Sequence, residues 1–131
     1  MKSSITNRKR ILVVEDEAAI SNLCERVLTS EGFEVDVAAD GKVAKAMILV
    51  QRYDLYLLDI KMPVLDGKGL YRWLQEAYPD SVCRVVFTTG SVMGEDTQSF
   101  LQNSDRQVLA KPFTPEELKA EIRQSLKAVE G

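Results

Sequence analysis

The sequence predicts an α/β fold in which five parallel strands form one sheet with helices on both faces. Short apolar runs, typical of buried parallel strands, alternate with longer segments whose apolar residues recur at helical spacing. This alternation occurs five times along the chain, which favours right-handed strand–helix–strand crossovers. With 131 residues and 45% hydrophobic content, the chain is large enough for one domain with its own core.

The composition excludes several classes of function. The chain contains no histidine, which rules out Ser-His-Asp or Cys-His catalysis, imidazole metal ligation and phosphorylation of its own histidine. The net charge of -3 gives no field that would attract nucleic acid, so we expect no direct nucleic-acid binding. Residues 1–10 lack the apolar core of a signal peptide, and no window approaches membrane-spanning length. We therefore expect a cytoplasmic protein without membrane insertion.

The two cysteines give no sign of a metal or redox site. Cys24 and Cys83 lie far apart, without CxxC spacing and without histidine to complete a zinc site. Because free cysteine is among the most often buried residue types, we expect both to be buried, reduced thiols.

The first two strand–helix units occupy residues 10–50. Residues 10–14 form a β-branched apolar run that ends at the acidic segment 15–17, and a helix is expected from there to about residue 31, where Gly32 stops it. Period-two alternation over residues 33–37 predicts a strand nearer the sheet edge. Asp40 and Gly41 then open a second helix.

The third unit contains the segment on which the functional interpretation depends. An apolar run after Asp54 ends in Asp59, and a turn marked by proline and glycine leads to a helix expected over residues 67–78, before Pro79. Asp54 precedes the strand and belongs at the opposite edge of the sheet, whereas Asp66 and Gly67 are explained by turn and cap chemistry. Open α/β sheets bind ligands just beyond the carboxyl ends of their strands, which makes Asp59 the candidate reactive group.

The last two units complete the predicted sheet. Residues 83–90 predict a fourth strand that ends in hydroxyls and glycine, and residues 91–105 predict a short polar helix, the segment expected to move most. Residues 107–110 predict a fifth strand, followed by Lys111-Pro112, a type of peptide bond for which the cis form is accessible. Thr114 as cap, Pro115 at the first position and Glu117 three residues after the cap then predict the start of the last helix.

Polar side chains follow four of the five predicted strands. Glu15 and Asp16 follow the first, Asp59 the third, Thr89 the fourth and Lys111 the fifth. In a parallel sheet all these ends lie at one edge. Three carboxylates brought together repel one another unless a cation joins them, and ligation by oxygen alone favours Mg²⁺ or Mn²⁺ over zinc. Lys111 can neutralise phosphate charge, and the Thr89 hydroxyl can donate to a phosphate oxygen.

Each of these residues has a simpler explanation when it is considered singly. The acidic segment 15–17 could serve only to stabilise a helix N-terminus. Lys111 could be a solvated loop lysine, Thr89 an ordinary turn residue and Asp59 a residue that starts a turn. Their joint placement at four strand ends is what favours a functional site.

Four segments of the chain resemble the signature segments of the response regulator receiver domain. They are VVEDE (13–17), LLDIKMPVLDG (57–67), FTTG (87–90) and LAKPF (109–113). The resemblance extends from about residue 9 to residue 129, and the order and spacing of the four segments are specific to the family. It implies a flavodoxin-like (βα)5 receiver domain over residues 9–131, with strand order 2-1-3-4-5, preceded by a tail over residues 1–8.

The resemblance also implies a role in two-component phosphorelay signalling. Asp59 would accept a phosphoryl group from a phosphohistidine on a sensor histidine kinase or a histidine phosphotransfer protein, in a Mg²⁺-dependent reaction. The groups implied to serve the Mg²⁺ are Glu15, Asp16, Asp59 and the backbone carbonyl of Lys61. Thr89 and Lys111 would contact the phosphoryl group. The chain would catalyse only its own phosphorylation and dephosphorylation and would signal to a downstream protein, with a phosphorylation-dependent dimer as a further form.

Two positions depart from the common family pattern. Val108 stands three residues before Lys111, where the family often has Tyr or Phe, so the resemblance does not imply an aromatic switch here. Glu15 stands where many members have aspartate, a change that keeps the charge and lengthens one arm.

Two other functions remain open from the sequence. A small Mg²⁺-dependent phosphatase that forms an aspartyl intermediate often has a second aspartate two positions after the nucleophile, where this chain has Lys61. A receiver-fold interaction module that is never phosphorylated would not bind Mg²⁺. Because the chain ends soon after the last predicted helix, we expect a single-domain regulator, a relay element or part of a longer hybrid kinase.

Overall fold

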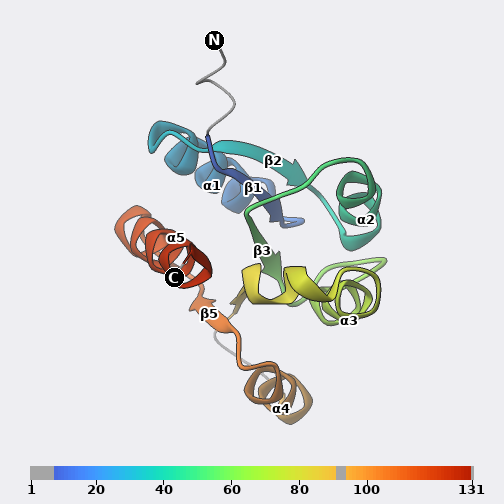
Figure 1. The fold of residues 1–131 in the computed structure, drawn as a ribbon. Helices are drawn as coiled ribbons and strands as arrows, with labels where there is room; N and C mark the ends of the chain where they lie inside the picture. Colours follow the sequence, from blue (N-terminus) through green and yellow to red (C-terminus); the bar gives the residue numbers. More distant parts are fainter. Residues whose placement is uncertain (1–7, 91–93, 131) are drawn as a thin grey trace.

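The computed structural model describes residues 8–90 and 94–130 and contains the parallel sheet predicted from the sequence (Figure 1). Its strands are β1 (Arg10–Val14), β2 (Glu34–Ala38), β3 (Leu55–Asp59), β4 (Val85–Thr89) and β5 (Gln107–Ala110). They are hydrogen-bonded in the order β2-β1-β3-β4-β5, and every neighbouring pair is parallel. The predicted order is confirmed, with β2 at a sheet edge.

Helices cover both faces of the sheet. They are α1 (Ala18–Ser30), α2 (Gly41–Val50), α3 (Gly67–Ala77), α4 (Glu95–Ser104), α5 (Pro115–Glu130) and the 3-10 helix η2 (Pro79–Arg84). Figure 1 shows α1 and α5 on one side of the strands and α2 and α3 on the other. The core is divided accordingly: α2, α3 and α4 pack against Leu58 and Phe87, whereas α1 and α5 pack against Leu57 and Val86. Alternate residues of a central strand thus supply both core layers.

The end of α1 and the starts of α2, α3 and α5 lie where local sequence signals predict. Gly32 follows α1 with φ of 97°, a left-handed conformation that suits glycine. The side chains of Asp40 and Asp66 cap α2 and α3. Thr114 Oγ1 accepts a hydrogen bond from the Glu117 N–H at 3.1 Å, and the Glu117 side chain accepts one from the Thr114 N–H at 2.8 Å. These two bonds form the predicted capping box of α5. The Lys111–Pro112 peptide is cis.

The segment before β4 differs from the prediction. β4 begins at Val85 because Pro79–Arg84 forms a 3-10 helix, for which Pro79 supplies a suitable first residue. Cys83 lies in this helix and is exposed, so the prediction of a buried thiol there was wrong. Cys24 is buried as predicted, and burial raises the pKa of its thiol to about 12.

Two sequence expectations fall partly outside the described residues. The mobile segment expected over residues 91–105 includes residues 91–93, and the structure begins α4 only at Glu95. The proposed tail over residues 1–8 includes residues 1–7. Within residues 8–90 and 94–130, no helix combines the length and apolar character needed to cross a membrane.

Candidate functional site

The carboxyl ends of four strands bring the predicted side chains to one edge of the sheet. Glu15 follows β1, Asp59 is the last residue of β3, Thr89 is the last residue of β4, and Lys111 follows β5. Asp59 lies opposite Thr88 in the β3–β4 ladder. The Lys111 N–H donates to the Thr89 carbonyl at 2.7 Å, so the backbone itself holds these ends together.

Lys111 lies between two buried carboxylates. Its Nζ is 2.8 Å from Glu15 Oε1 and 3.0 Å from Asp59 Oδ2, and its side chain is only 12% exposed. Burial acts to lower the pKa of Lys111, but its hydrogen bonds to Glu15 and Asp59 raise it overall. Lys111 is therefore a charged, partly enclosed group and not a solvated loop lysine.

Three carboxylates surround the point where β1 and β3 end. Glu15, Asp16 and Asp59 each offer one oxygen, and these oxygens lie within 4.8 Å of one another. Glu15 is 3% exposed and Asp59 4%, while Asp16 is exposed to solvent. Burial raises the pKa of Glu15 to about 7, although its hydrogen bond with Lys111 opposes the rise. This oxygen-only set, partly open to water, fits a hard divalent cation such as Mg²⁺.

The loop after β3 is folded back onto Asp59. The Lys61 N–H donates to Asp59 Oδ1 at 3.2 Å, and the Gly67 N–H donates to the Ile60 carbonyl at 3.1 Å. A Cβ on Gly67 would overlap the Asp59 carbonyl oxygen, so glycine permits this close approach. Val64, 77% exposed with φ of 70°, lies at the outer part of the loop. From sequence, Gly67 was interpreted only as a turn and cap residue, and its contact with Asp59 was missed.

Thr89 is placed at the site, and its hydroxyl makes only one weak hydrogen bond within the described residues. It is 5% exposed, and its hydroxyl donates to the Gly90 carbonyl at 3.5 Å, the outer limit for such a bond. The hydroxyl can therefore turn to a better acceptor. Because Thr89 is buried at the end of β4, it is not an ordinary, solvent-exposed turn residue.

Two further acidic residues lie outside the carboxylate cluster: Glu17 lies beside it, and Asp54 lies at the opposite edge of the sheet. Glu17 was not singled out from the sequence, yet its carboxylate lies 3.8 Å from Lys111 Nζ, and its N–H donates to Glu15 Oε2 at 3.1 Å. Asp54 lies at the opposite edge of the sheet as predicted, where its Oδ2 accepts a hydrogen bond from the Arg10 N–H at 2.7 Å.

Comparison with known proteins gives consistent matches over nearly the whole chain. A family model described as the response regulator receiver domain matches residues 11–123. Transcription factor SKN7 of Saccharomyces cerevisiae is 35% identical over 127 residues, which are 95% of this chain and 20% of that protein. The DNA-binding response regulator MtrA of Mycobacterium tuberculosis H37Rv is 35% identical over 122 residues, 93% of this chain and 52% of that protein.

Solved structures match to a similar extent. A CheY-like response regulator receiver domain protein from Methanospirillum hungatei JF-1 is 30% identical, with a TM-score of 0.86 and coverage of 95% of this chain and 98% of that one. The receiver domain of sensor histidine kinase PA1611 from Pseudomonas aeruginosa PAO1 is 31% identical, with a TM-score of 0.81 and coverage of 92% and 98%. That structure has a magnesium ion coordinated in its active site cleft.

Proposed function

The chain belongs to the response regulator receiver domain family of two-component signalling, and we propose that Asp59 is its phosphoryl acceptor. One observation carries the proposal: Asp59 ends a buried strand with Lys111 Nζ 3.0 Å from its carboxylate and two further carboxylates beside it. A lysine bound directly to the acceptor balances charge as the phosphoryl group arrives.

Mg²⁺ is the cation we propose for the carboxylate cluster. The proposed ligands are Glu15, Asp16, Asp59 and the backbone carbonyl of Lys61, whose N–H already bonds Asp59. When bound, the ion would neutralise negative charge on the acceptor and on the phosphoryl oxygens. The magnesium in the PA1611 receiver domain and the oxygen-only donor set support this choice, and Mn²⁺ has the same ligand preference.

The proposed reaction transfers a phosphoryl group from nitrogen to oxygen. An Asp59 carboxylate oxygen attacks the phosphorus of a partner's phosphohistidine, the P–N bond breaks, and the imidazole leaves with the electron pair and takes up a proton. Lys111 and the Thr89 hydroxyl would contact the phosphoryl oxygens, which gain charge in a loose transition state. The proposed donor is a sensor histidine kinase or a histidine phosphotransfer protein. The chain itself has no histidine, so the phosphohistidine would be on another protein.

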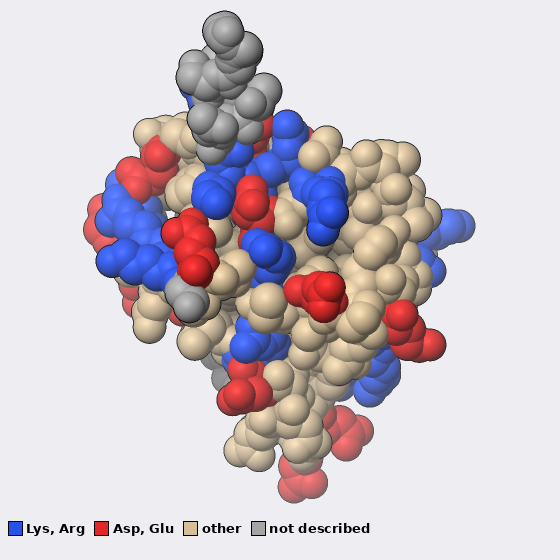
Figure 2. All heavy atoms as spheres, in the orientation of Figure 1, with Lys and Arg blue, Asp and Glu red and all other residues tan. Residues whose placement is uncertain are grey.

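The proposal extends to the organisation and the partners of the domain. Residues 9–131 would form the receiver domain after a tail over residues 1–8, and the phosphorylated domain would signal to a downstream protein or to a second copy of itself. Phosphohistidine donors are made from ATP, which supports a cytoplasmic location. Direct nucleic-acid binding is not part of the proposal: the net charge is -3, and Figure 2 shows both signs of charge interspersed over one face. MtrA is described as DNA-binding, and this chain covers only 52% of that protein.

The test is phosphorylation by acetyl phosphate in the presence of Mg²⁺. Intact mass spectrometry should show one added phosphoryl group on the wild type and none on Asp59→Asn. Asp54→Asn is the matched control, because it removes a carboxylate just before the same strand, at the opposite edge of the sheet. It should be labelled like the wild type. Equal labelling of wild type and Asp59→Asn would remove Asp59 from this role.

The two alternative functions have their own readouts. A phosphatase would turn over a phosphate ester such as p-nitrophenyl phosphate, but Lys61 stands at the position where an acid/base aspartate would be needed. An unphosphorylated interaction module would fail to bind Mg²⁺ and to accept phosphate from any donor. A phosphotransfer profile against the histidine kinases of the source organism would identify the partner.

A further inference from the structure

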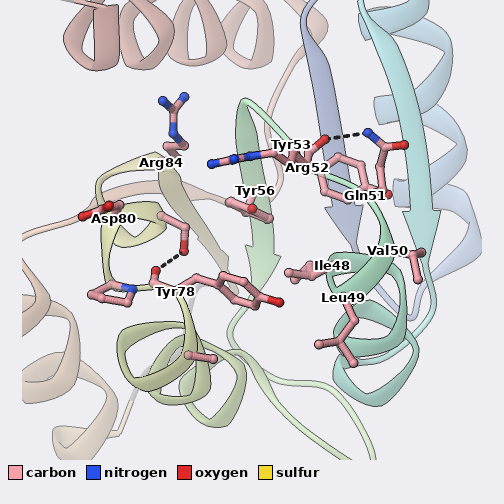
Figure 3. A pocket seen from close by; sticks show the side chains of 13 residues that line it. Ile48, Leu49, Val50, Gln51, Arg52, Tyr53, Tyr56, Tyr78, Asp80 and Arg84 are labelled. Atoms are coloured by element: carbon pink, nitrogen blue, oxygen red, sulfur yellow. Dashed lines mark hydrogen bonds between the residues drawn. The ribbon is translucent and has the colours of Figure 1, made fainter.

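A pocket lies at the opposite end of the sheet from Asp59. It has a volume of about 670 Å³ and is lined by the C-terminal end of α2, the segment leading into β3, and η2 (Figure 3). Small-molecule sites in proteins usually have volumes of about 300–1,000 Å³. Tyr56, near the start of β3, forms part of its wall, whereas Asp59 ends the same strand at the other edge. The pocket is therefore separate from the proposed phosphorylation site.

The pocket holds two positive charges without partner carboxylates. Arg52 and Arg84 both line it, and neither forms an ion pair in the described part of the chain. Within residues 8–90 and 94–130, the Arg84 side chain donates to a neutral group, the Asp54 carbonyl, at 3.2 Å. In Figure 3 the Arg52 side chain extends above Tyr56 toward Arg84. Asp80, the acidic residue that lines the pocket, is exposed and points away from Arg52 in this view.

The charges of both arginines act on the same buried group. Burial raises the pKa of the Tyr56 hydroxyl, and the charges of Arg84 and Arg52 oppose the rise. Both guanidinium charges thus act at the hydroxyl of Tyr56, which lines the same pocket. Guanidinium groups bind carboxylates through paired hydrogen bonds, and such bonds strengthen where a wall excludes water.

The opposite side of the pocket is apolar and unusually exposed. Leu49 is 62% exposed, Val50 85% and Tyr78 38%, and together with buried Ile48 they line the pocket. Half of the six large hydrophobic residues that are exposed in the described ranges are therefore found at this one place. A concave group of apolar side chains beside unpaired charge is a typical ligand-binding composition.

We propose that this pocket binds a small organic anion whose carboxylate contacts Arg52 and Arg84 and whose aromatic or branched aliphatic body packs between Leu49 and Tyr78. The carboxylate supplies the charge that the two arginines lack, and the ligand body covers the exposed apolar wall. A simple inorganic anion would leave that wall in water. A neutral apolar compound would leave the guanidinium groups unpaired.

The test compares indole-3-acetate with its neutral analogue indole-3-acetamide by ¹H–¹⁵N NMR on the full chain. Indole-3-acetate should give saturable shifts of backbone amides in residues 48–56 and 78–84, with half-saturation near or below about 1 mM for a ligand of this size. The acetamide should bind at least about tenfold more weakly, because it lacks the charge-assisted hydrogen bonds.

Two variants, each lacking one positive charge, show whether indole-3-acetate binding depends on the pocket or on net charge. Arg52→Gln removes an exposed guanidinium from the pocket and should weaken indole-3-acetate binding about tenfold. Lys42→Gln removes an exposed charge from the start of α2, outside the pocket, and should bind like the wild type. Equal binding of acid and amide, no effect of Arg52→Gln, or shifts centred on Lys111 would each overturn the proposal. Phosphorylation of Asp59 is measured separately, so failure here leaves the proposed function unaffected.

Discussion

Lys111 determines the electrostatic state of the site in the absence of a bound ion. Its ammonium group bridges Glu15 and Asp59, at 2.8 and 3.0 Å, and partly compensates two carboxylates that burial would otherwise destabilise. The compensation is incomplete, because the pKa of Glu15 is still raised to about 7 by burial. The charge of Glu15 therefore changes within the ordinary working range of pH.

This raised pKa predicts that Glu15 makes the metal-free protein less stable as pH rises. Between 4.5, its ordinary value, and about 7, the folded state holds a proton on Glu15 that the unfolded state has lost. The unfolding free energy therefore falls as the pH rises through this window. Above pH 7 the full destabilisation by ionised, buried Glu15 is present. Relative to Glu15→Gln, the wild type should lose on the order of 2 kcal/mol between pH 5 and pH 8. Urea unfolding in EDTA at several pH values measures this difference.

Glu17→Gln is the matched control for this experiment. It removes an exposed carboxylate 3.8 Å from the same lysine. If the effect belongs to the buried Glu15 carboxylate, Glu17→Gln should not reproduce the change seen in Glu15→Gln. If the Glu15→Gln curve is parallel to the wild type, burial of Glu15 does not control the pH dependence.

Sequence reasoning could place the site residues but not the contacts between them. Glu15, Asp59, Thr89 and Lys111 were predictable because parallel strands all end at one edge. That Lys111 would bond both carboxylates, instead of remaining in solvent, depends on side-chain geometry and burial that no spacing reveals. Glu17 was missed for the same reason, since its approach to Lys111 depends on the turn between β1 and α1.

Besides α3, which follows it directly, the loop after β3 is also held by the start of α2. The Gly41 N–H donates to the Leu65 carbonyl at 3.0 Å, and a Cβ on Gly41 would overlap that carbonyl oxygen and the Leu65 side chain. The same loop carries Lys61, which bonds Asp59. The first residue of α2 therefore helps to set the position of the loop beside the acceptor.

Gly41→Ala should consequently destabilise the protein although alanine is the better helix former. The overlap must be relieved by moving backbone atoms of Leu65, and overpacking of this kind costs about 1–3 kcal/mol. Gly94→Ala, where a Cβ meets no atom within 4 Å, is the control and should change stability by less than about 1 kcal/mol. Urea unfolding of both variants provides the comparison. A loss no larger for Gly41→Ala than for Gly94→Ala would contradict the close contact.

Helices with clear end signals could be predicted from the sequence, whereas the 3-10 helix before β4 could not. Thr114, Pro115 and Glu117 define the start of α5 through local hydrogen bonds, which sequence alone encodes. Residues 79–84 are too short and too mixed to show a period, and their 3-10 conformation is accompanied by an Arg106 bond to the distant Cys83 carbonyl. The error about Cys83 followed from extending β4 by two residues.

For the whole molecule, Mg²⁺ binding should be coupled to folding. The proposed ligands lie directly after β1 and at the end of β3 and just beyond it, so the cluster exists only when the sheet is formed. At a Mg²⁺ concentration about 100 times its dissociation constant, the unfolding free energy should rise by about 2.7 kcal/mol. Thermal unfolding in MgCl₂ and in NaCl of equal ionic strength measures the gain. The gain should shrink in Glu15→Gln, and also at pH 5, where Glu15 is neutral.

An equal gain in wild type and Glu15→Gln would mean that the ion acts elsewhere on the protein. Arg52→Gln, at the opposite end of the molecule, should keep the full Mg²⁺ effect. This variant separates the carboxylate cluster from general effects of charge.

The two ends of α2 lie at two different sites of the domain. Its first residue bonds Leu65 in the loop beside Asp59, and its last residues, Leu49 and Val50, form a wall of the pocket at the far edge of the sheet. A helix of 10 residues is a stiff rod about 15 Å long. A single helix thus joins the loop beside Asp59 to the rim of the pocket, so one element outside the sheet contacts both ends of the domain.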